Sequence, residues 1–365
     1  MNNTIDLKQE RNSAVELLRI IAMFFIVMSH SSVHGSFPSV NSQITLNNYL
    51  LDWLCLGNLG SVIFVMISGY FLSVKERRSQ SMVKLLAQVW FYSYICLAIH
   101  FLTGNTASIR EIKRALFPTI YDEYWFFTAY IIVLIFCPYI NIFIKNTSRK
   151  QLLSCLVIMM VLWSIIPTFT QMSMLGSELP QFLFFYLLGA YLRKYTDHAL
   201  SMPKFRRWLI GCSAVLLLAS SLVLRFFNDC IWPFSIFETW FYGRSSIFVI
   251  GLAIGMTAAA VYHKPWSNKI VNRISSCTFG VYLLHDNPFI REILWPVWMN
   301  NDAYYDSKTL IFRIFLSVVI VYAGCVFIEL VRQKLFAKPL EYLIEKACGK
   351  FSYAVRRCAI YKSKY

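Results

Sequence analysis

The chain has 365 residues, 57% of them hydrophobic, and a formal net charge of +16. Its mean hydropathy of +0.53 lies far above that of soluble proteins, and many apolar runs reach transmembrane length. These values exclude a soluble globular protein and predict an all-α, polytopic membrane helical bundle. In such a protein, excess Lys and Arg mark cytoplasmic loops, so the charge gives no reason to expect nucleic-acid binding.

Hydropathy predicts ten transmembrane helices along the chain. They lie near residues 14–34, 56–73, 86–103, 124–144, 151–168, 180–195, 208–226, 242–262, 274–293 and 309–331. If the N-terminus is cytoplasmic, the inner loops and the tail hold most of the 35 basic residues. This asymmetry predicts that both termini are cytoplasmic, in agreement with an even number of spans. We expect one transmembrane domain over residues 1–332 and a basic cytoplasmic tail over residues 333–365, which suits contact with anionic lipid headgroups.

The first predicted helix carries three ionisable residues at membrane depth, Glu16, Arg19 and His30. At about 100° per residue, Arg19 and His30 fall on one face, about 16 Å apart along the axis. Glu16 lies one turn before Arg19 and can pair with it. Such groups usually face a bundle interior or a wet cavity, so we expect a polar stripe that faces a water-accessible tunnel. The alternative is that Glu16 and Arg19 are only interfacial residues.

Several catalytic and metal-binding motifs are missing from the sequence. We find no Walker loop, no dinucleotide-binding glycine pattern, no G-x-S-x-G elbow and no H-E-x-x-H. The ten cysteines occur without a C-x-x-C pair, so neither a zinc site nor a disulfide framework is indicated. We therefore expect no metal and no tightly bound cofactor.

Polar residues and glycines do interrupt several of the apolar helices. The second span contains Ser68-Gly69-Tyr70, which allows close helix packing or a local opening of the backbone. A basic cluster that includes Arg77, Arg78 and Lys84 follows it and suits a phosphorylated cytoplasmic donor, although positive-inside charge alone also explains it. The fourth span opens with Tyr124-Trp125-Phe126, which is typical of an aromatic belt.

The ninth span ends in a second histidine with a carboxylate beside it. It reads Thr278-Phe279-Gly280, then Tyr282, and closes on His285-Asp286. His285 is either a second candidate base or a packing residue. A separate segment, residues 107–123, alternates basic and apolar residues and is either an amphipathic helix on the outer leaflet or a plain connecting helix.

Taken in order, these blocks resemble the acyltransferase-3 family of integral-membrane O-acyltransferases. The resemblance covers roughly residues 14–330 and rests on the following blocks: Arg19 and His30, Gly60 to Tyr70, Tyr124 to Phe126, Phe185 to Gly189, and Thr278 to His285. It implies transfer of an acyl group, usually acetyl from cytoplasmic acetyl-CoA, to a hydroxyl of a cell-surface glycan or its lipid-linked precursor. An exopolysaccharide or O-antigen in a bacterium is the expected acceptor, and the cytoplasmic membrane is the expected location.

The resemblance implies that His30 and Arg19 carry the activity, with Glu16 orienting Arg19. An imidazole suits removal of a hydroxyl proton at neutral pH, and His30 can act as the base or carry the acyl group transiently. We expect donor or acceptor contacts from Ser68, Tyr70, Arg77, Arg78, Lys84, Trp125, Tyr282 and His285. Many family members have a basic motif that ends in proline after the second span, and often Ser at the position of Thr278. This chain has the charges without the proline, and Thr keeps the hydroxyl.

Two alternatives to this function stay open on the sequence. One is a transporter or flippase of a lipid-linked glycan, which also needs a polar cavity, but no inverted repeat supports it. The other is an acyltransferase that uses another acyl donor, such as succinyl, or a non-sugar acceptor.

Overall fold

The computed structural model describes residues 11–37, 45–74, 79–170, 178–195, 198–230 and 239–362 of the chain. Within these ranges all regular structure is helical, and no β-strand occurs. The prediction of an all-α, polytopic membrane protein is confirmed.

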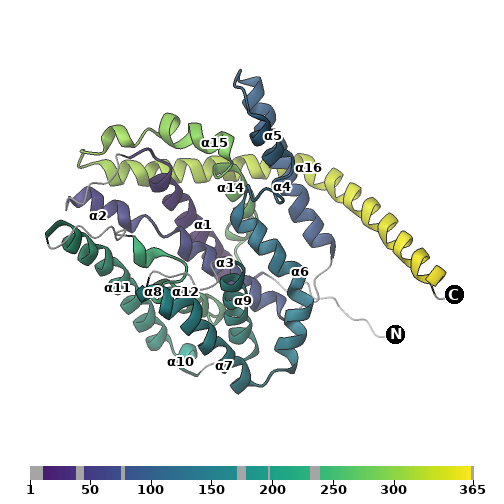
Figure 1. The fold of residues 1–365 in the computed structure, drawn as a ribbon, viewed down its shortest axis with the longest axis horizontal. Helices are drawn as coiled ribbons and strands as arrows, with labels where there is room; N and C mark the ends of the chain where they lie inside the picture. The colour runs from purple at the N-terminus through teal and green to yellow at the C-terminus, as the bar shows by residue number, and fades with distance from the viewer. Residues whose placement is uncertain are drawn as a thin grey trace.

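Eight stretches of the described residues are long and apolar enough to cross a membrane, and Figure 1 shows them gathered into a bundle. They are formed by α1 (Ser13–Val33), α2 (Leu46–Trp53) with α3 (Gly57–Leu72), α4 (Ser79–Leu102), α6 (Trp125–Asn146), α7 (Arg149–Met160) with the π-helical turn η1 (Val161–Ile165) and α8 (Ile166–Thr170), α11 (Pro203–Cys230), the 3-10 turn η2 (Trp240–Tyr242) with α12 (Ile247–Val261), and α16 (Leu310–Lys362). The shorter elements are α5 (Ile109–Leu116), α9 (Glu178–Lys194), α10 (His198–Ser201), α13 (Lys269–Ser275), α14 (Thr278–His285), α15 (Pro288–Ile293), the π-helical turn η3 (Leu294–Met299) and the 3-10 turn η4 (Asp302–Tyr304).

The two remaining predicted spans differ from the others. The span near 180–195 is α9, a helix of 17 residues whose middle is buried on all sides by other helices. The span near 274–293 is wrong as a single helix, because it is divided into α13, α14 and α15. The total of ten spans and the cytoplasmic placement of both termini remain predictions.

Helices α3 and α9 pack closely together, and two glycines make this contact possible. A Cβ at Gly69 would overlap the backbone of Tyr186, and a Cβ at Gly189 would overlap the backbone of Met66. The Ser68-Gly69-Tyr70 step therefore serves close packing within a continuous helix. Around this pair the first apolar core extends to α6, α7 and α12, while a second core joins α1, α4, α14 and α16.

Two segments lie at the margin of the bundle. The predicted amphipathic helix is α5, which begins with a capping box formed by Ser108 and Glu111 and leaves Ile109 exposed. Its placement on a leaflet remains a prediction. Helix α16 continues without a break across the expected domain boundary at residue 332, and its C-terminal end projects beyond the other helices (Figure 1).

Candidate active site

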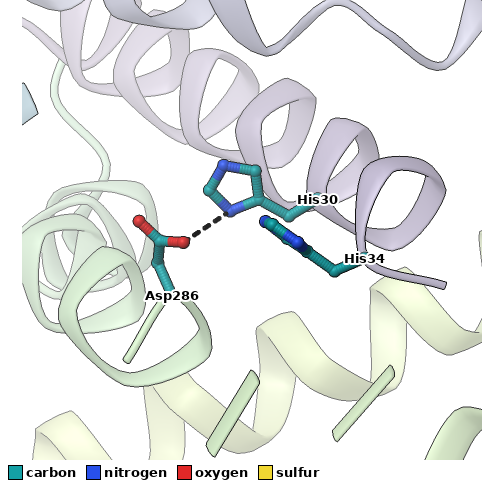
Figure 2. A group of neighbouring side chains, drawn as sticks. All are labelled: His30, His34 and Asp286. Atoms are coloured by element: carbon teal, nitrogen blue, oxygen red, sulfur yellow. Dashed lines mark ion pairs between the residues drawn. The ribbon is translucent and has the colours of Figure 1, made fainter. Parts of the chain in front are cut away.

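His30 and His285 meet at the centre of the candidate site, although 255 residues separate them. His30 lies in the last turn of α1, and His285 is the last residue of α14. The His30 Nδ1 atom lies 3.0 Å from the His285 Nε2 atom. Figure 2 shows His30 and Asp286, from neighbouring helices, pointing toward one another, with 3.4 Å between His30 Nδ1 and Asp286 Oδ1. The second histidine is thus a direct partner of the first.

A helix break places these two residues beside His30. Asn287 accepts a hydrogen bond from the backbone N–H of Phe289 and begins α15, with Pro288 at the first helical position. Proline disfavours helical geometry in the residue before it, so α14 ends at His285 and Asp286 caps it. The Asn287 amide also donates to the Tyr124 hydroxyl at 2.8 Å, which ties the break to α6. In the sequence, the dipeptide Asn287-Pro288 could have predicted this break.

The hydrogen bonds assign the proton positions on the two rings. His285 Nδ1 lies 2.6 Å from the backbone carbonyl oxygen of Val281, which can only accept, so this nitrogen carries a hydrogen. A neutral His285 then presents Nε2 as an acceptor, and His30 Nδ1 donates to it. Asp286, also an acceptor, favours the same tautomer of His30. The Nε2 atom of His30 is left with the lone pair, which is the state that a general base requires.

Two residues that the sequence did not point to complete the cluster. The Arg291 guanidinium lies 3.2 Å from the Asp286 Oδ1 atom, and the His34 ring packs edge-on against His30 with 5.3 Å between ring centroids. His34 follows His30 by four residues, so helical spacing was the signal for it. Arg291 offered no comparable signal, because only the fold brings α15 to this place.

The cluster also has the spacing of a metal site. Donor atoms of His30, His34 and Asp286 all lie within 4.8 Å of one another. However, Arg291 contacts the Asp286 Oδ1 atom, and its positive charge opposes a cation there. His30 Nδ1 is already bonded to His285. Proton transfer therefore fits this arrangement better than metal binding.

Aromatic residues connect the histidine pair to α3. The Ser68 hydroxyl is hydrogen-bonded to the Tyr130 hydroxyl at 2.8 Å, and the Tyr130 ring stacks on Phe126. The ring centroids of Phe126 and Tyr282 lie 5.8 Å apart, and those of Tyr282 and His285 lie 6.5 Å apart. The structure thus brings Ser68, Tyr282 and His285, predicted from separate motifs, into one contiguous set.

Arg19 belongs to a second polar cluster, nearer the start of α1. It donates to Glu16 at 3.0 Å, which confirms the predicted pairing, and its guanidinium lies 5.9 Å from the Phe71 ring centroid. Glu16 also accepts from the Ser275 hydroxyl at 2.5 Å, so α13 holds the carboxylate in place. The structure does not bring Arg19 into the histidine cluster.

Tyr70 extends this second cluster on α3. The Arg193 guanidinium lies 5.1 Å from the Tyr70 ring centroid and donates to its hydroxyl at 3.3 Å. Arg193 lies in the last turn of α9. Lys84 lies in the second turn of α4, whereas Arg77 and Arg78 fall outside the described residues.

Three cavities among the described residues are lined by neither Arg19 nor His30, so the predicted tunnel remains a prediction.

Trp125 lies apart from both clusters, at the start of α6. The Arg244 guanidinium lies 4.4 Å from the centroid of the Trp125 ring system and also pairs with Glu178 at 3.1 Å. A cation over an indole is favourable, so these residues join the starts of α6, α9 and α12. A cavity of about 250 Å³ also lies by the start of α12, lined by Trp240, Phe241 and the hydroxyl-bearing residues Thr168, Ser245 and Ser246 among others.

Fold and site together define a multi-pass helical membrane protein with a histidine pair, His285 buried and His30 partly buried, next to a carboxylate. The chain belongs to the acyltransferase 3 family: the family model described as an acyltransferase domain matches residues 12–330. It is therefore a membrane-bound acyltransferase. Comparisons with curated proteins and with solved structures gave no match.

Proposed function

We propose that this protein transfers an acetyl group from cytoplasmic acetyl-CoA to a hydroxyl of a cell-surface polysaccharide, or of its lipid-linked precursor, in the bacterial cytoplasmic membrane. The family supplies the acyl transfer. The observation that carries the proposal is the 3.0 Å contact of His30 Nδ1 with His285 Nε2, together with the Val281 carbonyl at His285 Nδ1. These contacts favour the tautomer of His30 in which Nε2 holds the lone pair. Exopolysaccharide and O-antigen repeats are acceptors of the proposed kind.

In the proposed reaction, His30 Nε2 takes the proton from the acceptor hydroxyl. The hydroxyl oxygen forms a bond with the acetyl carbonyl carbon, the C–S bond of the thioester breaks, and the proton passes from His30 to the departing CoA sulfur. The imidazolium formed on the way lies beside the Asp286 carboxylate, which stabilises its charge. His285 holds the ring in the reactive tautomer and thus positions the base.

The cluster around Arg19 is the proposed donor end. Arg19, Arg193 and Lys84 can bind CoA phosphates, and Arg77 and Arg78 belong to the same basic segment of the sequence. The separation of about 16 Å between Arg19 and His30 along α1 is one that an extended pantetheine arm can span. Glu16 and Tyr70 hold the two arginines in place.

The 250 Å³ cavity beside α12 is the proposed acceptor end. Aromatic rings next to hydroxyl groups suit a sugar, which has apolar faces and polar edges. Trp240 and Phe241 provide the rings. The cavity lies by the first residues of α3 and α12, at the end of the bundle where α1 also ends, with His30 in its last turn.

His30→Gln tests the proposed base. Because Gln cannot take a proton at neutral pH, we expect kcat to fall about 100- to 10,000-fold while the protein folds and reaches the membrane normally. The assay is mass spectrometry of the surface polysaccharide from a deletion strain that carries the variant, together with turnover of purified protein with acetyl-CoA. His263→Gln, at an exposed histidine beyond α12, is the matched control.

The same assay separates the alternatives. Loss of acetylation with a normal amount of surface glycan supports the proposal, whereas loss of the glycan itself indicates a transporter. A different mass increment on the wild-type glycan, such as succinyl, would overturn the assignment of the donor.

A second test addresses the donor end. Arg193→Gln removes a charged hydrogen-bond donor, so we expect the KM for acetyl-CoA to rise about 10-fold with kcat little changed. Lys145→Gln, an exposed lysine in the last turn of α6, is the control for charge. An unchanged KM would contradict the placement of CoA near Tyr70.

A further inference from the structure

An apolar groove of about 460 Å³ lies where α7 and η1 pass over α9, far from the histidine pair in the sequence. Its floor includes Met66 of α3 and Leu188 of α9. This volume is within the range of small-molecule sites in proteins. Among the lining residues, only Arg149, Lys150 and Tyr191 carry polar side-chain groups, and Arg149 and Lys150 both belong to the first turn of α7.

The groove is long enough to hold a lipid acyl chain. One wall is a stripe of residues in steps of four, Arg149, Leu153, Val157, Val161 and Ile165, and the π-helical turn continues it beyond α7. At about 1.5 Å per residue, the stripe extends about 24 Å from the basic end. One leaflet of the hydrocarbon core is about 15 Å thick, so the stripe covers the headgroup level and a full leaflet.

The wall faces outward and is not sealed by other helices. Leu153 is 45% exposed, Val157 54% and Val161 38%, although all three lie in a stretch long and apolar enough to cross a membrane. Met66, on the floor, is fully buried. The groove is therefore a furrow in the surface that faces the hydrocarbon, open to a lipid from the side.

The basic end attracts an anion. Arg149 and Lys150 are exposed and lie at the N-terminus of α7, where the helix dipole is already positive. Arg149 Nε is held by the Tyr191 hydroxyl at 3.3 Å, which keeps the guanidinium over the mouth of the groove.

We propose that this groove binds one anionic phospholipid, with its phosphate against Arg149 and Lys150 and one acyl chain along the stripe from Leu153 to Ile165. The charge selects the headgroup, and the apolar furrow fixes the chain between α7 and α9. The bound lipid then fills the space over Met66, beside the close contact of α3 and α9 at Gly189.

The test is native mass spectrometry of the purified full-length protein in detergent, titrated with phosphatidylglycerol or phosphatidylcholine. We expect phosphatidylglycerol to bind at least 10-fold more tightly. At about 1 kcal/mol for each basic residue, Arg149→Gln with Lys150→Gln should weaken its binding about 30-fold. Lys269→Gln, an exposed lysine on α13, should leave it unchanged.

A second variant tests the furrow. Val157→Trp fills the groove and should abolish retention of phosphatidylglycerol, whereas Val215→Trp, at an exposed position of α11 that does not line the groove, should not. Equal binding of the two lipids overturns the choice of an anionic headgroup. Undiminished binding by the Arg149 and Lys150 double variant or by Val157→Trp overturns the site itself.

Discussion

Asp286→Asn isolates the contribution of one charge to the proposed proton transfer. Asparagine keeps the shape of the side chain and an oxygen that can accept from His30 Nδ1, so the variant removes the negative charge and little else. In the proton transfer, the charge matters when His30 is an imidazolium, which is the state formed as the acceptor hydroxyl loses its proton. The variant should therefore lower kcat and leave the KM for acetyl-CoA unchanged.

The magnitude follows from the geometry. At 3.4 Å between His30 Nδ1 and Asp286 Oδ1, a full charge pair is worth about 5 kcal/mol for an effective dielectric constant of about 20. Arg291, 3.2 Å from the same oxygen, neutralises part of this attraction. We expect a net loss of about 3 to 4 kcal/mol, which corresponds to a fall in kcat of about 100- to 1,000-fold.

The assay is turnover of acetyl-CoA by purified protein with the acceptor glycan, with the melting temperature recorded for each variant. Glu329→Gln is the matched control, since this carboxylate is also buried and paired with an arginine, Arg332, but lies in the contact between α16 and α4. Both variants should lower the melting temperature, and only Asp286→Asn should lower kcat. If a folded Asp286→Asn variant keeps kcat within twofold of the wild type, Asp286 does not stabilise a charged His30.

Further predictions concern stability, measured by thermal unfolding in detergent. Gly189→Ala should lower the free energy of unfolding by about 3 kcal/mol, because the added methyl group overlaps the backbone of α3. Gly211→Ala, which has open space around it, should leave the free energy of unfolding unchanged or raise it by up to about 1 kcal/mol. Equal effects of the two variants would refute the role of glycine in the contact of α3 with α9. Arg225 forms a buried, two-pronged ion pair with Asp52 at 2.5 and 2.8 Å, so Arg225→Ala should cost about 3 to 5 kcal/mol. Replacing both Arg225 and Asp52 by Leu should recover most of the lost free energy of unfolding. If it does not, the unpaired charge of Asp52 is not the reason that Arg225→Ala destabilises the protein.

The class of protein and the local geometry of its helices could be predicted from the sequence. Hydropathy located eight stretches that the structure forms as apolar helices of transmembrane length, because partition into a bilayer depends on composition over about 20 residues. The pairing of Glu16 with Arg19 was equally predictable, since helical spacing alone brings the two side chains together. The motif order was enough to indicate the family that residues 12–330 match.

The predicted helix over 274–293 shows the limit of predicting helices from hydropathy. Its hydropathy is that of a span, but the turn at Asn287 and Pro288 interrupts it and frees the end of α14. Hydropathy is an average over many residues, so it does not register a break that two residues cause. That break gives His285 and Asp286 their orientation.

Which polar groups meet depends on how the helices pack. His285 lies 255 residues after His30, and the contact between the two rings exists only because α14 packs against α1. Arg193 acquires its partner, Tyr70, only through a contact between α9 and α3. Periodicity reports which residues of one helix share a face. Which face of another helix lies opposite depends on how all the helices pack, and that is a property of the whole bundle.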